Sequence, residues 1–292
     1  MSGSNSKSYC GRLFTPAELE MIRELIAADR HLTRAALSRL VCDELGWVRP
    51  DGRRKDMSCR VAMLRMHRDG LLVLPPPTKR NGNGHTRPRP SAATAPEEAI
   101  GGSAGELGPL EFKLVGPADT RLWNELIERY HYLGYKPLPG AQLRYFVFAA
   151  GRRLAALGFA AAAWKAHPRD AFIGWTPQER ARNLHLIVNN ARFLILPWVR
   201  CPNLATRILG HMARLVPHHW QTHYGYRPVL LETFCEQDRF RGTCYRAANW
   251  IHLGLTQGRG KLDRYKRYAL PIKAILVYPL TSDFRAKLCT PP

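Results

Sequence analysis

The chain lacks a long apolar run. None of its hydrophobic stretches approaches the roughly 18 residues that a membrane-spanning helix requires. Its first seven residues are polar and do not resemble a signal peptide. These two absences argue against an integral membrane protein, and they predict a cytoplasmic protein without membrane contacts.

Cysteine is also scarce. The 292 residues include seven cysteines, an odd number, without a C-x-x-C motif or a Cys/His pairing at zinc-site spacing. This pattern excludes a disulfide framework and predicts reduced thiols. No metal site is expected from the cysteines.

Acidic residues are the third shortage. The chain has 44 Lys and Arg against 23 Asp and Glu, a net charge of +21. Most of the excess lies in residues 111–292, which hold 27 basic against 11 acidic residues. A positive field of this size attracts polyanions, and nucleic acid is the leading partner for a protein without a membrane helix. A merely solvated basic surface is the alternative.

Signals for helix starts and ends stand out near the N-terminus. Thr15 and Glu18 have the spacing of a capping box, in which both side chains satisfy free backbone amides. Apolar residues then recur at helical spacing to about residue 29. Thr33 can cap a second helix, which ends at Gly46.

A third helix is predicted over about residues 56–69, and the apolar run Leu71–Leu74 predicts a short strand after it. Three short helices followed by a strand are typical of a winged helix-turn-helix, whose last helix lies in the DNA major groove. We therefore predict such a domain over residues 1–74, with Val61 and Leu64 holding the last helix to the core. A small helical domain for protein contacts is the alternative. The side chains expected to reach DNA are Arg53, Arg54, Lys55, Ser58 and Arg60.

Residues 75–110 contain Pro, Gly, Asn, Ser and Ala without apolar periodicity, which predicts a flexible linker. A second domain is expected over residues 111–292. In it, the apolar runs Phe193–Val199 and Val229–Phe234 are each followed by a loop and a helical pattern. Such units predict an α/β (α+β) fold, a mixed sheet with helices on its faces, and ligands bind where its strands end.

Two residues of the second domain are candidate catalytic groups. Glu232 is the one acid between Glu179 and Glu236, and it lies in an apolar strand. Its carboxylate is either a general base or metal ligand, or half of an internal ion pair with an arginine. Tyr245 could donate a proton or contact a phosphate, and packing at a helix start is the alternative.

The candidate DNA contacts of the second domain fall into two groups. Arg200, Asn203 and Asn249 lie near predicted element ends, where the amides either read base edges or satisfy open backbone groups. The second group alternates with tyrosines after the last expected strand, a mixture suited to phosphate contacts and base stacking, or else it forms a solvated tail. It comprises Arg259, Lys261, Arg264, Lys266 and Arg267.

The order of helix, hairpin, central strand, phosphate-type turn, helix, strand, helix and last strand resembles that of the GNAT acyltransferases. In that family the turn after the central strand binds the pyrophosphate of coenzyme A through backbone amides at a helix N-terminus. Here the corresponding turn is 200–205, where Asn203 stands in place of Gly and Pro202 lacks an amide. Asn tolerates left-handed geometry, so we expect the backbone path to survive and coenzyme A not to bind.

A second resemblance covers most of the second domain. Several strings of residues, in the right order, are similar to the DruA family of the Druantia anti-phage systems, whose domain also occurs fused to insertion-sequence transposases. The strings are His131–Tyr135, Leu186–Ile195, Pro202–Ala205, Leu231–Phe234 and Gly242–Trp250. The resemblance implies a role in DNA transactions of phage defence or of mobile elements.

The sequence thus predicts a DNA-binding protein with a winged helix-turn-helix domain followed by a GNAT-like domain. Its expected partners are duplex DNA, single-stranded DNA as a further target, and proteins of a defence or transposition system. No cofactor is expected. Two enzyme alternatives stay open: a metal-dependent strand-transfer enzyme or nuclease using Asp170, Glu232 and Asp238, and an acyltransferase using Glu232 as base and Tyr245 as acid. The oligomeric state stays open.

Overall fold

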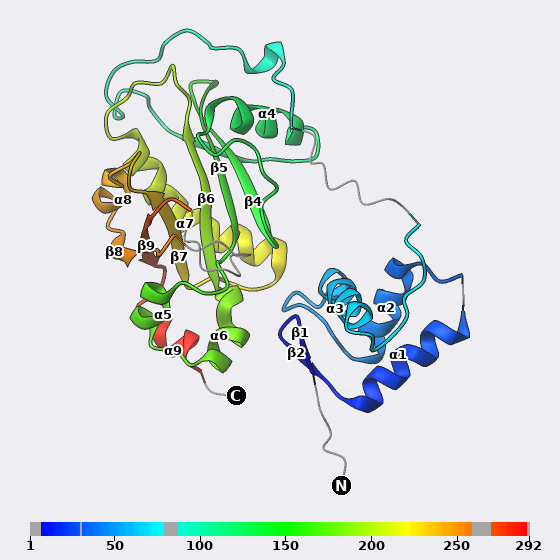
Figure 1. The fold of residues 1–292 in the computed structure, drawn as a ribbon. Coiled ribbons are helices and arrows are strands. Elements are labelled where there is room, and N and C mark those ends of the chain that lie inside the picture. The colour runs from blue at the N-terminus through cyan, green and yellow to red at the C-terminus, as the bar shows by residue number, and fades with distance from the viewer. Residues whose placement is uncertain (1–6, 30, 79–86, 259–269, 291–292) are drawn as a thin grey trace. The chain divides into compact units, whose positions relative to one another are not determined.

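The computed structural model describes residues 7–29, 31–78, 87–258 and 270–290. The chain divides into two compact units, Met1–His85 and Thr86–Pro292 (Figure 1). Each unit has its own hydrophobic core.

In the described part of the first unit, residues 7–29 and 31–78, the chain forms a short antiparallel hairpin and three helices. The hairpin at its start was missed in the sequence. The three helices are confirmed, and the first has the expected capping box between Thr15 and Glu18. The elements are β1 (Lys7–Tyr9), β2 (Arg12–Phe14), α1 (Pro16–Ala28), α2 (Arg34–Glu44) and α3 (Asp56–Arg68).

Three features of the first unit differ from the expected winged helix-turn-helix. Residues 71–74 form no strand; Leu72 and Leu74 instead bury their side chains against the helices. Val61 is 40% exposed, because α3 turns Cys59, Met63 and their neighbours toward the core. The connection between α2 and α3, residues 45–55, contains a bridge between Val48 and Arg54 and is longer than the usual three- to four-residue turn. The winged helix-turn-helix assignment stays a prediction.

The second unit is built on one seven-stranded sheet, which confirms the predicted mixed α/β fold. Its order is β3-β4-β5-β6-β7-β9-β8; β6 and β7 are parallel, and every other neighbouring pair is antiparallel. The strands are β3 (Glu111–Leu114), β4 (Gln142–Ala149), β5 (Arg152–Ala161), β6 (Ile187–Ile195), β7 (Leu230–Glu236), β8 (Ile251–Leu255) and β9 (Lys273–Pro279).

Two strands differ from expectation. The central strand β6 begins at Ile187, before the apolar run, because Asn189 and Asn190 are part of it. Strand β9 was missed; it inserts between β7 and β8 and pairs antiparallel with both. The element order otherwise follows the GNAT-like order that the sequence predicts.

Helices cover both faces of the sheet. Trp123 of α4 donates to Leu157 O of β5, and Arg144 of β4 lies over the same ring. The adjacent Tyr145 points to the other face and stacks with His219 of α7, so α4 and α7 lie on opposite faces (Figure 1). The helices are α4 (Thr120–Tyr130), α5 (His167–Ile173), α6 (Pro177–Asn183), α7 (Leu204–Tyr224), α8 (Thr243–Ala247) and α9 (Phe284–Leu288), with 3-10 turns at Ala92–Thr94 and Leu184–Leu186.

Residues 91–106 lie within the linker predicted over 75–110, and they form contacts inside the second unit. The amide and hydroxyl of Ser91 donate to Glu125 at 2.9 and 2.5 Å. The hydroxyl of Tyr130 donates to Thr94 O at 2.7 Å, and Ile100 is buried beside Val199. The segment has these contacts although it lacks apolar periodicity, and the predicted linker bounds stay a prediction.

We expect Glu125→Ala to release this segment, because the buried carboxylate is the acceptor for both donors of Ser91. Hydrogen exchange of the backbone amides around residues 91–94 should accelerate in the variant. Glu98→Ala, which removes an exposed acid from the same segment, is the control. Unchanged exchange in Glu125→Ala would contradict this account of the packing.

Candidate nucleic-acid interface at the ends of the parallel strands

The parallel strands β6 and β7 pair over only three positions and then diverge. Ile187, Val188 and Asn189 face Leu230, Leu231 and Glu232, and beyond these residues β6 pairs only with β5 and β7 only with β9. The carboxyl ends of neighbouring parallel strands are the usual place for a ligand in a sheet of this kind. Three segments surround this end: the loop after α4, the N-terminus of α7, and α8.

Tyr245 of α8 fills the gap between the diverging strands. Its hydroxyl donates to Asn190 Oδ1 at 2.6 Å, and its ring packs edge-to-face against Phe193 and Trp250. Burial raises the pKa of Tyr245, so the hydroxyl stays protonated and acts as a donor. This environment matches the packing alternative, and the proposed acid role of Tyr245 stays a prediction.

Glu232 is fully buried in an ion pair. Its carboxylate accepts from Arg169 Nη1 at 2.7 Å and from the amide of Ala163 at 2.8 Å. Arg169 also donates to Asp170 at 2.7 Å. The environment is that of the ion-pair alternative, and a catalytic role for Glu232 stays a prediction. Within the described ranges no three His, Cys, Asp or Glu side chains gather in a way that could hold a metal ion.

Asn203 and Asn249 both adopt a left-handed backbone, which at Asn203 is the geometry expected from the resemblance to the GNAT turn. Their φ angles are 64° and 62°. Asn203 precedes α7 and Asn249 follows α8; the two helices pack together, and Thr206 Oγ1 of α7 donates to Cys244 O at 3.5 Å. Both asparagines and Arg200 are exposed, so all three predicted contacts lie on the rim of the strand ends.

The turn before α7 offers few free amides to a pyrophosphate. The amide of Arg200 donates to Ile100 O at 2.8 Å, and that of Leu204 donates to Cys201 O at 3.3 Å. Pro202 has no amide to give. The turn therefore fits coenzyme A poorly, and the expectation that coenzyme A does not bind stays a prediction.

Two further cations on this rim were missed in the sequence. Arg241 and Arg246 flank the start and end of α8 and are exposed, as is Arg200. Among the described residues, none of these three guanidinium groups has a carboxylate within ion-pair distance. The available signal was the local scarcity of acids: residues 239–258 contain three arginines and no Asp or Glu.

Beside the strand ends lie a buried arginine and a histidine, Arg192 and His131, which together with Lys273 are called the inner wall. Arg192 of β6 is only 9% exposed, and burial lowers the pKa of its guanidinium. Burial, with the nearby charges of Arg192 and Lys273, lowers the pKa of His131 to about 4. The amide of Leu133 donates to His131 Nδ1 at 3.2 Å, so the neutral ring carries its proton on Nε2. No role was predicted for either residue from the sequence.

Two of the five DNA contacts predicted in the first unit form ion pairs with acidic residues. Arg54 pairs with Asp43, and Arg60 pairs with Asp56 at 3.0 Å. Arg53 is exposed on the connection before α3, while Lys55 and Ser58 are half-buried. The basic residues predicted in the tail lie outside the described residues; these are Arg259, Lys261, Arg264, Lys266 and Arg267.

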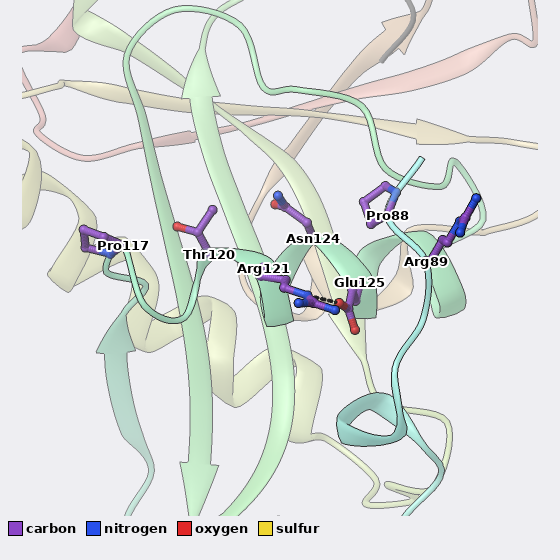
Figure 2. Close-up of a pocket in the computed structure, with 7 residues that line it drawn as sticks. All are labelled: Pro88, Arg89, Pro117, Thr120, Arg121, Asn124 and Glu125. Atoms are coloured by element: carbon purple, nitrogen blue, oxygen red, sulfur yellow. Dashed lines mark hydrogen bonds and ion pairs between the residues drawn. The ribbon is translucent and has the colours of Figure 1, made fainter. Parts of the chain in front are cut away.

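A separate pocket of about 360 Å³ lies along α4 (Figure 2). Pro88, Thr120 and Asn124 line it, and Figure 2 shows Arg121 paired with Glu125. Since Glu125 is also bound by Ser91, this pocket has no uncompensated acid. It is a weaker candidate than the strand ends.

None of the helices in the described ranges is long and apolar enough to cross a bilayer.

Comparison with protein families identifies the chain. Residues 66–275 match the family described as Druantia protein DruA. The protein belongs to the DruA family. Membership supports a role in anti-phage defence, and no curated protein matches the DruA-family chain.

Solved structures similar to this DruA-family protein are acetyltransferases of low identity. The ribosomal-protein-S18-alanine N-acetyltransferase from Escherichia coli is 8% identical, with 59% of this chain and 95% of that chain covered and a TM-score of 0.40. The polyamine N-acetyltransferase from Drosophila melanogaster is 12% identical, with coverage of 59% and 100% and a TM-score of 0.38. We infer no function from similarity at this level.

We expect Glu232→Gln to destabilise the second unit by about 3 kcal/mol, because removing one charge of a buried pair leaves Arg169 undercompensated. The glutamine oxygen can still accept from Ala163, so the loss reports the charge. Urea unfolding followed by tryptophan fluorescence measures it, since six of the seven tryptophans lie in this unit. Glu111→Gln, at an exposed position, is the control, and equal stability of both variants would contradict the ion-pair account.

The lowered pKa of His131 predicts a pH dependence of stability. The unfolded chain binds a proton below the ordinary pKa of 6.5, whereas the folded chain does so only near pH 4. The contribution of neutral His131 to the free energy of unfolding is therefore complete above pH 6.5, and it is lost as the pH falls toward 4. His131→Asn, whose oxygen can accept from Leu133, should therefore lose about 2 kcal/mol less stability than the parent protein between pH 7 and pH 5. Parallel pH profiles for both proteins would contradict the assignment.

Proposed function

We propose that this DruA-family protein binds DNA during anti-phage defence, and that the rim around α7 and α8 contacts the phosphate backbone. The proposal is supported mainly by three exposed guanidinium groups that have no carboxylate partner in the described ranges. They belong to Arg200, Arg241 and Arg246. Such groups keep their full positive potential toward solvent. When they neutralise phosphates, counterions are released from the DNA, and this release favours binding.

The outer face of α7 extends this basic rim. Over its 21 residues the helix contains two arginines and four histidines but no acid. Arg214 and His218 are exposed on it. A DNA strand lying along α7 would therefore meet no carboxylate of that helix, which favours an extended backbone contact over a single anion site.

Asn203 and Asn249 are the groups on this rim suited to base edges. Both side chains are exposed, and neither forms a hydrogen bond within the described structure. An amide offers a donor and an acceptor together, the pattern that an adenine edge requires. We therefore assign the phosphate contacts to the arginines and the base contacts to the asparagines at this end of the sheet.

The acyltransferase alternative has less support. It requires Glu232 and Tyr245 to reach a substrate, but both are buried and hydrogen-bonded in the described structure.

The DNA proposal predicts a change in salt dependence. Arg200→Ala/Arg246→Ala should weaken binding of a labelled duplex and lower the slope of log affinity against log salt by about 2, since each phosphate contact contributes about 0.9. Fluorescence anisotropy at several salt concentrations measures both quantities.

The matched control is Lys165→Ala/Arg182→Ala, which removes two exposed charges next to α5 and within α6, at the other end of β6. We expect the control to keep the parental slope. If both double variants lost the same amount, only the net charge would matter, and a parent protein that bound no DNA at low salt would refute the proposed function.

A further inference from the structure

We infer that the inner wall of the strand ends is a nucleotide-binding site, at which Arg192 binds a terminal phosphate and the edge formed by Tyr132 and Phe240 holds a base. The inference rests on the proposed DNA binding, because it names the part of a strand that this end of the sheet would recognise. A free nucleotide carries the same chemistry as the phosphorylated end of a single strand.

Arg192 is a buried cation without a compensating anion. Its Nη1 donates to Ala191 O at 2.7 Å, while its buried Nε has no partner. No carboxylate of the described chain lies within ion-pair distance of it. A buried charge without a counterion is costly, so a phosphate is a fitting missing partner.

A second buried arginine of this unit differs from Arg192. Arg169 of α5 is fully buried, and two carboxylates neutralise it, Glu232 and Asp170, each at 2.7 Å. Arg169 thus has counterions within the chain, whereas Arg192 has none among the described residues.

The neighbours of Arg192 favour an anion. His131 is neutral at physiological pH and offers an Nε2–H donor, and Lys273 adds a second positive charge to its surroundings. Glu236, an acid near Tyr132, is already bound by Arg239 at 3.0 Å. The residues facing the proposed phosphate are therefore Arg192, Lys273 and the neutral His131, with Glu236 compensated by Arg239.

An aromatic edge adjoins this basic wall. The rings of His131 and Tyr132 stack with centroids 4.9 Å apart, and Phe240 meets Tyr132 edge-to-face at 5.1 Å. Arg239 lies 5.6 Å from the Tyr132 ring. Phe240 is 47% exposed although it is a large apolar residue. The exposed ring of Phe240, beside Arg239 and the half-buried Tyr132, has the aromatic and cationic character that commonly holds an unpaired base.

A β-bulge positions Arg192. The pairing between β5 and β6 shifts between Gly158 and Phe159, which face Arg192 and Asn190, so Ala191 is the extra residue. The guanidinium of Arg192 donates to the carbonyl of that residue, and Asn190 Nδ2 donates to Arg192 O at 3.2 Å. Bulges redirect side chains and occur often beside functional sites.

The test compares short single strands that carry a 5′-phosphate, a 3′-phosphate or only hydroxyl ends. The parent protein should bind one of the phosphorylated strands about tenfold more tightly than the hydroxyl strand, the gain expected of a charge-assisted contact. Arg192→Gln should abolish this difference and leave the salt slope for duplex DNA unchanged. Phe240→Ala should weaken all three strands several-fold and keep the preference for phosphate.

Arg153→Gln is the matched control, since it changes a partly buried arginine of the neighbouring strand β5 whose guanidinium lies over Phe146 and Phe148. It should retain the phosphate preference. A competition arm with deoxynucleoside monophosphate identifies the source: competition at low concentration supports a free nucleotide, and competition by phosphorylated strands alone supports a strand end.

Equal binding of all three strands by the parent protein, or a preference that survives in Arg192→Gln, would overturn the inference. If the parent still bound duplex with a steep salt slope in that case, the proposed DNA binding would stand alone. If no DNA bound at all, the proposed function would be refuted. Binding of the deoxynucleoside monophosphate that is lost in Arg192→Gln would then still support the inference, and no binding of it would overturn the inference.

Discussion

The divergence of β6 and β7 is the constraint on which this end of the second unit depends. After Asn189 and Glu232 the two strands no longer share hydrogen bonds, so other groups must satisfy the polar atoms between them. Tyr245 and Asn190 do so on one side of the gap, and Thr233 Oγ1 donates to Asn190 O at 3.0 Å. Because these side chains occupy the gap, the exposed arginines lie on its rim and Arg192 lies on the inner wall.

Charge is distributed around this gap in two ways. The buried pair of Arg169 and Glu232 stabilises the amino-terminal side of the parallel strands, where the helices α5, α6 and α9 pack (Figure 1). At the carboxyl side Arg239 pairs with Glu236, whereas Arg200, Arg241 and Arg246 have no carboxylate partner among the described residues. This asymmetry gives the sheet one end built for stability and another suited to a polyanion.

Much of this could be predicted from local sequence signals. The capping box at Thr15, the helices of the first unit and the mixed sheet follow from residue types at fixed spacing, and the left-handed backbone at Asn203 follows from the resemblance to the GNAT turn. The ion pair of Glu232 was one of two stated alternatives, because a lone acid in an apolar strand needs a partner.

The remaining features depend on contacts between distant parts of the chain. Strand β9 joins the sheet by pairing with β7 and β8, and Ser91 is held by Glu125, 34 residues later. The apolar run at 71–74 resembles a strand but has no partner strand. Arg192 could have been noticed as a charged residue in a central strand, yet its lack of a counterion is visible only when its surroundings are known.

The most direct test of the account is hydrogen exchange of the whole protein with and without a saturating single strand that carries a terminal phosphate. We predict protection concentrated in the segments that surround the strand ends, 131–135, 190–206 and 239–249. Protection confined to the first unit, or to the α5, α6 and α9 end of the sheet, would contradict the claim that the diverging strands form the nucleic-acid interface.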